Sequence, residues 1–227
     1  MNTAISHHRA GRSEESLLAY RQALKHNPQD DFAFACLADI LNNLGRYEEA
    51  LVACRCAIDL NSTCVLAYFS KVEALLNLHL YEAAIETCEQ VIALAPFEAT
   101  AYTFKADLLA DLQRDREALV AYAQALQLNP RCAAIYNNLG VLLTRMRHLE
   151  QAQHCYEKAI RLESGEAVYY FNLSHLLEDL EKWEEAEQVR IIAEELSLPG
   201  VQTAILKAAK APWEDIPTVY LPSPTRA

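Results

Sequence analysis

The chain of 227 residues has little glycine, little proline and few basic side chains. It contains five glycines and eight prolines, and four of those prolines fall within the last 16 residues. Low glycine content together with abundant alanine and leucine favours helices throughout. The formal net charge of −11 disfavours nonspecific binding to nucleic acid or to an anionic membrane surface.

Secretion signals and long apolar runs are also missing. The polar opening, "MNTAISHHRAGRSEES", has no apolar segment typical of a signal peptide. The longest apolar runs fall far short of the roughly 20 residues that a membrane span needs. The seven cysteines, an odd number, do not suggest the disulfide framework of a small secreted domain. We therefore expect a cytoplasmic protein that binds no membrane.

Motifs of catalysis are not found in the sequence. It has no glycine-rich phosphate loop, no H-E-x-x-H, no C-x-x-C and no G-x-S-x-G. Cys54 and Cys56 lie two positions apart, about 200° around a helix, so they do not readily share a metal ion. His154 and Cys155 are neighbours whose side chains point about 100° apart, which disfavours a catalytic dyad. We expect no enzyme activity, no cofactor and no metal site.

What the chain does contain is a repeat of 34 residues, whose register holds from residue 10 to about residue 198. Three columns of the repeat keep one type of residue. The aromatic column comprises Phe34, Tyr68, Tyr102, Tyr136 and Tyr170. The leucine column comprises Leu41, Leu75, Leu109, Leu143 and Leu177. The alanine column comprises Ala50, Ala84, Ala118, Ala152 and Ala186.

Within one repeat the apolar residues have helical spacing. The first stripe of the second unit comprises Phe34, Leu37, Ala38 and Leu41, at positions i, i+3, i+4 and i+7. Gly45 then interrupts the pattern, as a helix C-terminal glycine does, and a second stripe runs from Tyr47 to about Leu60. One pair of helices cannot bury both of its faces alone, so neighbouring pairs must stack.

This pattern resembles the tetratricopeptide repeat (TPR) family. The resemblance is carried by "AYFSKVEALLNLHLYEAAIETCEQVIALAP" at 67–96 and by "IYNNLGVLLTRMRHLEQAQHCYEKAIRLE" at 135–163. It extends over most of the chain and is specific for the fold, while it says little about function. It implies an all-α, right-handed superhelical solenoid of antiparallel helix pairs.

We expect the repeat array to occupy residues 1–198. It would consist of an incomplete first unit followed by units near 31–64, 65–98, 99–132, 133–166 and 167–198. A short leading helix is expected at about Thr3–Ala10. Residues 199–210 are predicted to form a capping helix over the exposed edge of the array, and residues 211–227 a Pro-rich extended tail.

In this family the first helix of each pair lines the concave face, where extended peptides or partner helices bind. The resemblance therefore implies a binding groove on these helices. In the N-terminal half the expected groove residues are Phe32, Asp39, Phe69, Ser70, Glu73, Phe104 and Asp107. Three carboxylates among aromatic side chains suit a basic partner with apolar anchors.

In the C-terminal half the expected groove residues are Asn137, Asn138, Arg145, Phe171, Asn172 and His175. Asparagine side chains both donate and accept hydrogen bonds, so a ladder of them can hold a peptide backbone, as it does in some TPR proteins. The clamp by which one subclass binds the acidic tails of chaperones is missing, since its positions carry Ala35, Asp39, Ser70, Thr100 and Phe104.

The function expected from these features is a noncatalytic protein-interaction scaffold or adaptor. Its ligand would be an extended peptide or a helix, preferably basic, with no nucleic acid among its partners. Two alternatives stay open. One is the recognition portion of a larger enzyme, such as a glycosyltransferase or a methyltransferase. The other is a self-assembling structural repeat that associates through its incomplete N-terminal unit.

Overall fold

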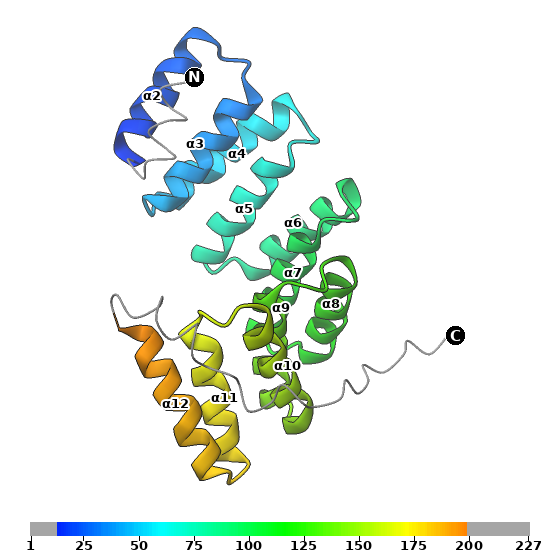
Figure 1. The fold of residues 1–227 in the computed structure, drawn as a ribbon. Helices are drawn as coiled ribbons and strands as arrows, with labels where there is room; N and C mark the ends of the chain where they lie inside the picture. The colour runs from blue at the N-terminus through cyan, green and yellow to red at the C-terminus, as the bar shows by residue number, and fades with distance from the viewer. Residues whose placement is uncertain (1–12, 199–227) are drawn as a thin grey trace, which may run out of the picture. The chain divides into compact units, whose positions relative to one another are not determined.

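The computed structural model describes residues 13–198, and the regular structure of this part of the chain is entirely α-helical (Figure 1). The all-α prediction is therefore confirmed for these residues. The leading helix predicted at Thr3–Ala10, the capping helix at 199–210 and the tail at 211–227 lie outside the described residues. None of the helices between residues 13 and 198 is long and apolar enough to cross a bilayer.

The chain divides into two compact units, Met1–Arg131 and Cys132–Ala227, which are called unit 1 and unit 2. In the described part of unit 1, residues 13–131, a single helix precedes three helix pairs. The helices of unit 1 are α2 (Ser13–His26), α3 (Asp31–Asn43), α4 (Tyr47–Leu60), α5 (Val65–Asn77), α6 (Tyr81–Leu94), α7 (Ala99–Asp111) and α8 (Asp115–Leu128). Each helix packs on the next along the chain, and α3 also packs on α5. These contacts are those of stacked helix pairs.

Residues 132–198, the part of unit 2 that the structure describes, contain two further pairs built in the same way. Their helices are α9 (Ala133–Arg145), α10 (Leu149–Leu162), α11 (Ala167–Asp179) and α12 (Trp183–Ser197). The first helices of the two pairs, α9 and α11, contact each other in addition to their pair partners. We refer to α3, α5, α7, α9 and α11 as the first helices.

Two residues after the last residue of each first helix stands a residue with a left-handed backbone. Gly45 has a φ of 70°, and the equivalent residues His79, Gln113, Arg147 and Glu181 have φ values of 57°, 59°, 63° and 59°. At the end of α3 the Arg46 N–H donates to the carbonyl oxygen of Leu41 at 2.8 Å, which closes the helix C-terminus. Glycine adopts this conformation without steric strain, whereas the other four residues carry a Cβ into it.

The alanine column lies where the helices of a pair approach each other. Ala50, Ala84, Ala118 and Ala152 are each 0% exposed. A methyl group at this position allows the two backbones to come close, and a larger side chain would hold them apart. The 34-residue period in the sequence is thus the period of the helix pairs, because the first helices start at residues 31, 65, 99, 133 and 167.

Candidate functional site

The seven groove residues predicted in unit 1 are called the acidic set: Phe32, Asp39, Phe69, Ser70, Glu73, Phe104 and Asp107. Asp39 lies on α3, Glu73 on α5 and Asp107 on α7, at equivalent positions of three consecutive first helices. All three side chains are partly exposed. The structure gives each of them different surroundings.

Asn42 links the first two of these helices. Its side chain is 4% exposed, and its Nδ2 donates to the Ser70 carbonyl oxygen at 2.7 Å and to Glu73 Oε2 at 3.3 Å. Ser70 itself is buried between the helices, so its side chain does not line a surface. Burial raises the pKa of Glu73, the hydrogen bond from Asn42 opposes that rise, and the charge of Asp39 adds to it. The charge of Asp39 on α3 therefore acts on Glu73 on α5.

Asp107 is held within its own helix pair. Its carboxylate accepts a hydrogen bond from the hydroxyl of Tyr122 on α8. Tyr122 is buried, so this carboxylate satisfies a hydroxyl group that would otherwise lie in the apolar core. Asp107 thus has a structural partner that the sequence spacing did not indicate.

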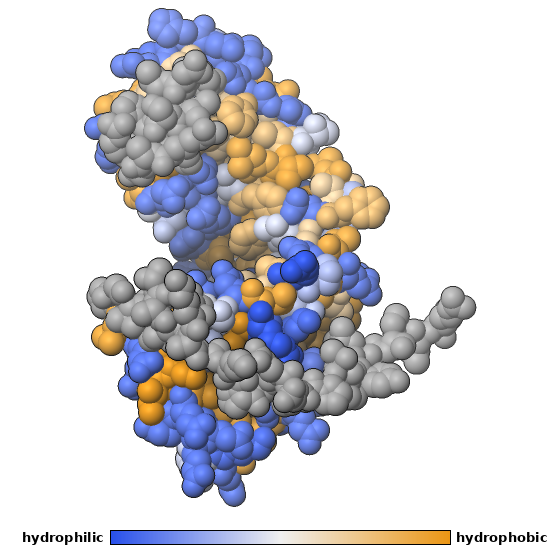
Figure 2. All heavy atoms as spheres, in the orientation of Figure 1, coloured by the Kyte–Doolittle hydropathy of each residue, from blue (hydrophilic) through white to orange (hydrophobic). Residues whose placement is uncertain are grey.

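Two of the three phenylalanines lie together. The rings of Phe69 on α5 and Phe104 on α7 have centroids 5.9 Å apart and are tilted by 45°, a favourable aromatic arrangement. Phe32 on α3 is 50% exposed. Figure 2 shows hydrophobic residues gathered over the part of unit 1 formed by α5 and α6. The most exposed large hydrophobic side chain of the described residues, Phe97 at 84%, lies in the turn between α6 and α7.

The six groove residues predicted in unit 2 are called the amide set: Asn137, Asn138, Arg145, Phe171, Asn172 and His175. Asn172 Nδ2 donates to Asn137 Oδ1 at 2.8 Å, and Asn137 Nδ2 donates to Asn138 Oδ1 at 3.2 Å. The structure therefore brings the three asparagines into one hydrogen-bonded chain across α9 and α11. Asn137 is 8% exposed, so its amide mainly joins the two helices.

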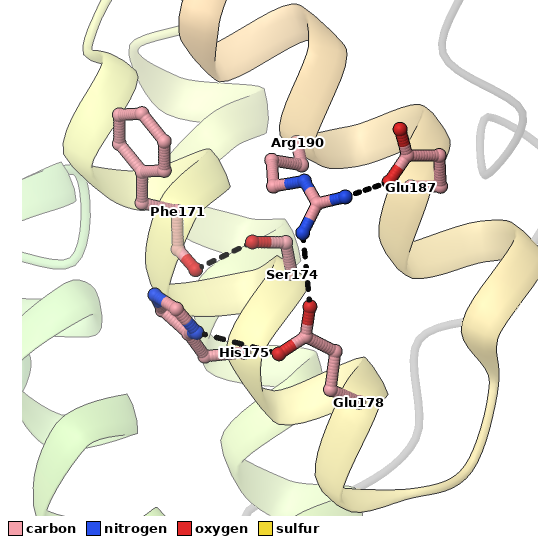
Figure 3. Close-up of polar contacts among 6 residues, drawn as sticks. All are labelled: Phe171, Ser174, His175, Glu178, Glu187 and Arg190. Carbon is pink, nitrogen blue, oxygen red and sulfur yellow. Dashed lines mark hydrogen bonds and ion pairs between the residues drawn. The ribbon is translucent and has the colours of Figure 1, made fainter.

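Of the remaining members of the amide set, His175 and Arg145 are exposed and Phe171 is partly exposed. Phe171 and His175 are one turn apart on the side of α11 that faces away from α12 (Figure 3). His175 Nδ1 lies 3.6 Å from a Glu178 carboxylate oxygen, and Arg190 on α12 pairs with Glu178 at 3.5 Å and with Glu187. Arg145 is exposed in the last turn of α9.

The thiol groups do not form a reactive cluster in the described part of the chain. All seven cysteines are free. Burial raises the pKa of Cys54, of Cys88 and of Cys155 to about 12 in each case, whereas Cys56 is partly exposed. Between residues 13 and 198 no three His, Cys, Asp or Glu side chains come together as metal ligands.

Three side chains with a part in these surfaces were not predicted from the sequence: Asn42, Tyr122 and Arg190. A signal for Asn42 was present, because it lies three residues after Asp39 and therefore on the same face of α3. Tyr122 and Arg190 stand two and four repeats after Cys54, at a position of the second helix that the helical spacing assigns to packing. Their hydroxyl and guanidinium groups reach the first helices only through the tertiary contacts.

Sequence models of one family match four stretches of the chain. Models described as tetratricopeptide repeat match residues 19–52, 65–98 and 133–165, and a model described as TPR repeat matches residues 106–146. Together these matches extend over more than half of the chain. A comparison with curated protein sequences gives no significant match.

Solved structures of similar fold include three proteins. PilF from Pseudomonas aeruginosa is 17% identical with a TM-score of 0.75, covering 91% of this chain and 94% of its own. MamA (residue 41 to the end) from Desulfovibrio magneticus RS-1 is 24% identical with a TM-score of 0.65, and the match covers 72% of this chain and 92% of the MamA chain. YrrB, described as a TPR protein with an unusual peptide-binding site, is 19% identical with a TM-score of 0.60. The match covers 83% of this chain and 97% of the YrrB chain. At these identities the likeness shows the fold alone.

Proposed function

The chain belongs to the tetratricopeptide repeat family, and on this premise we propose that it is a noncatalytic scaffold or adaptor that binds a basic peptide segment. The segment is extended or helical and lies on the first helices of unit 1, against the acidic set. The cellular compartment that we propose is the cytoplasm, which agrees with seven cysteines that are all free.

The observation that carries this proposal is the combination of charge and aromatic area on consecutive first helices. Asp39, Glu73 and Asp107 recur at one position of the repeat, and the Phe69–Phe104 pair lies on two of the same helices. Phe69 and Phe104 are partly exposed. An acidic patch beside partly exposed aromatic rings selects a partner by charge and anchors it by apolar contact. The peptide-binding site described for YrrB, a protein of the same fold, supports a peptide ligand.

A peptide display selection tests the proposal. The full chain is immobilised, a library of random dodecapeptides is passed over it, and the enriched sequences are measured by fluorescence anisotropy. We expect the enriched peptides to carry lysine or arginine together with aromatic or aliphatic residues. A selection that enriches no sequence, or only acidic ones, overturns the proposal.

A matched pair of variants then locates the binding surface. Phe69→Ala removes one ring of the aromatic pair and is expected to weaken binding of the enriched peptides about tenfold. Phe97→Ala removes the most exposed large hydrophobic side chain of the described residues, which lies outside the acidic set. It is expected to leave the affinity unchanged. The reverse result would move the binding surface to the turn between α6 and α7.

A further inference from the structure

Three polar side chains of unit 1 meet where α3 packs on α5. Asp39 and Asn42 lie one turn apart on α3, and Glu73 faces them from α5. The Asn42 amide contacts the Glu73 carboxylate at 3.3 Å, and the Asp39 charge acts on the same carboxylate. Glu73 forms no ion pair with a lysine or arginine of the described residues. Its negative charge is therefore not neutralised from within this part of unit 1.

The oxygen of the Asn42 side chain has no hydrogen-bond partner. Asn42 is 4% exposed, both bonds described above use its Nδ2, and its Oδ1 is the one buried side-chain polar atom without a partner among residues 13–198. An unsatisfied buried acceptor costs about 1–3 kcal/mol. The unsatisfied oxygen belongs to the same amide group whose Nδ2 contacts the Glu73 carboxylate.

A neutral donor could satisfy the oxygen alone, but the surroundings favour a cation. Two carboxylates and an amide oxygen are acceptors, and a lysine ammonium or an arginine guanidinium carries several N–H donors together with the complementary charge. Burial of part of the site strengthens such an attraction relative to that between groups fully in water.

We propose that Asp39, Asn42 and Glu73 form a subsite for one cationic side chain, lysine or arginine, of the bound segment. The cation lies between the Asp39 and Glu73 carboxylates and donates a hydrogen bond to Asn42 Oδ1. This inference rests on the proposed function, since the cation is taken to belong to a peptide on the acidic set. To that proposed function it adds the identity of the three residues that select a basic side chain in the partner.

The position of the subsite also sets a spacing in the partner. Glu73 lies four residues after Phe69 on α5, one helical turn away, and Phe69 contacts Phe104. One turn separates side chains by roughly 5–6 Å. That distance is close to the separation of residues i and i+2 in an extended peptide, at about 3.3 Å per residue, and to that of residues i and i+4 in a helix. The basic residue should therefore stand at one of these spacings from an apolar residue.

The test is a double-mutant cycle between the chain and a peptide. The probe is an enriched peptide from the display selection, compared with the same peptide in which its basic residue is replaced by norleucine. The chain variants Glu73→Gln and Asp39→Asn remove charge and keep the side-chain shape. Asn42→Leu introduces the residue that stands at the equivalent position 76 of the next repeat. The control, Asp59→Asn/Glu86→Gln, removes two exposed carboxylates of α4 and α6.

We expect each of the three variants to lower the affinity for the basic peptide about tenfold, equal to about 1.4 kcal/mol. The affinity for the norleucine peptide should not change. The control variant should bind as the unaltered chain does. A peptide series with lysine or arginine at the basic position distinguishes the two cations. Thermal unfolding of every variant shows whether it is folded. An unfolded variant is replaced by the conservative Asp39→Glu or Glu73→Asp, which should retain part of the preference for the basic peptide over the norleucine peptide.

The inference is overturned if the three variants lose equal affinity for both peptides, or lose none. Either result leaves the proposed function standing as long as Phe69→Ala still weakens the enriched peptide. If the selection enriches no peptide, the proposed function fails at the earlier step, so the two failures are distinguishable.

Discussion

Asn172 on α11 donates its side-chain amide to Asn137 Oδ1 on α9 at 2.8 Å, across 35 positions of the chain. Two successive first helices of unit 2 are thereby joined by a direct bond between side chains at adjacent positions of the repeat. The sequence suggested that these asparagines bind a peptide backbone. In the structure they bind one another, and this relationship affects stability.

Alanine variants of the two asparagines should be strongly non-additive. Asn137→Ala is expected to lower the free energy of unfolding by about 1 kcal/mol, and Asn172→Ala by a similar amount because it leaves a buried oxygen without its donor. The double variant should lose clearly less than the sum, as groups in one network do. Urea denaturation measures these differences, with the exposed Gln151→Ala as control. Additive losses would contradict a coupled pair.

Gly140→Ala is predicted to destabilise the chain even though alanine is the better helix former. A Cβ at Gly140 would lie 2.7 Å from Cε1 of the buried Tyr156 ring, so the ring has to move away from its hydroxyl partner Thr144. We expect a loss of about 1–3 kcal/mol. In a Tyr156→Cys background the same Gly140→Ala change should instead stabilise by up to about 1 kcal/mol. Thermal unfolding of the four proteins detects this reversal of sign, and an unchanged sign would refute the steric explanation.

Gln113→Gly should stabilise unit 1. Gln113 has a φ of 59° just after α7. The residue at the equivalent position after α3 is Gly45. Glycine relieves the left-handed strain of about 1–2 kcal/mol and loses part of this gain to backbone entropy. The net gain should be about 0.5–1 kcal/mol. Gln90→Gly, in the exposed interior of α6, is the matched control and should destabilise by about 1 kcal/mol.

Peptide affinity should fall as the pH falls. Burial raises the pKa of Glu73, the hydrogen bond from Asn42 lowers it, and the Asp39 charge raises it further, with a net rise. Glu73 then takes up a proton at a higher pH than an ordinary glutamate and loses its attraction for a cation. The affinity for the enriched basic peptide is therefore full above this pKa and decreases as the pH drops through it. In Glu73→Gln the decrease should begin at lower pH, as anisotropy titrations across mildly acidic pH would measure.

The same shift affects stability in the opposite direction. Because the pKa of Glu73 is higher in the folded chain than in the unfolded chain, its contribution to stability is fully present below the unfolded-state value. That contribution is lost as the pH rises through the folded-state value. Glu73→Gln should remove this dependence, as urea denaturation of the peptide-free chain at several pH values would show. If the unaltered chain instead gained stability with rising pH relative to Glu73→Gln, the raised pKa of Glu73 would be contradicted.

The thiols should differ in their rates of alkylation. Burial raises the pKa of Cys54, Cys88 and Cys155 to about 12, so at neutral pH they contain almost no thiolate. The partly exposed Cys56, Cys64 and Cys132 should react with iodoacetamide first. Peptide mass mapping at increasing times gives the order, and the urea-unfolded chain, in which all seven should react alike, is the control.

The sequence by itself determined the helices and their pairing. Tyr47, Ala50 and Cys54 form an apolar stripe whose period matches the α-helix, and the same stripe recurs every 34 residues, so the start and end of each helix follow from local chemistry. Cys54 on that stripe is buried, whereas Cys56, two positions further along the helix, is partly exposed. Helical periodicity depends only on the spacing of residues that are near one another in the chain, so the sequence alone is enough to predict it.

Only the tertiary structure decided what each polar side chain of the first helices contacts. Asp39, Glu73 and Asp107 are alike in the sequence, yet Glu73 meets Asn42 of another pair while Asp107 meets Tyr122 of its own pair. These differences depend on the distance between side chains of separate helices, to within an ångström, and on how much water the packing excludes. The pattern of one helix does not contain that information, because it arises when the helices pack on one another.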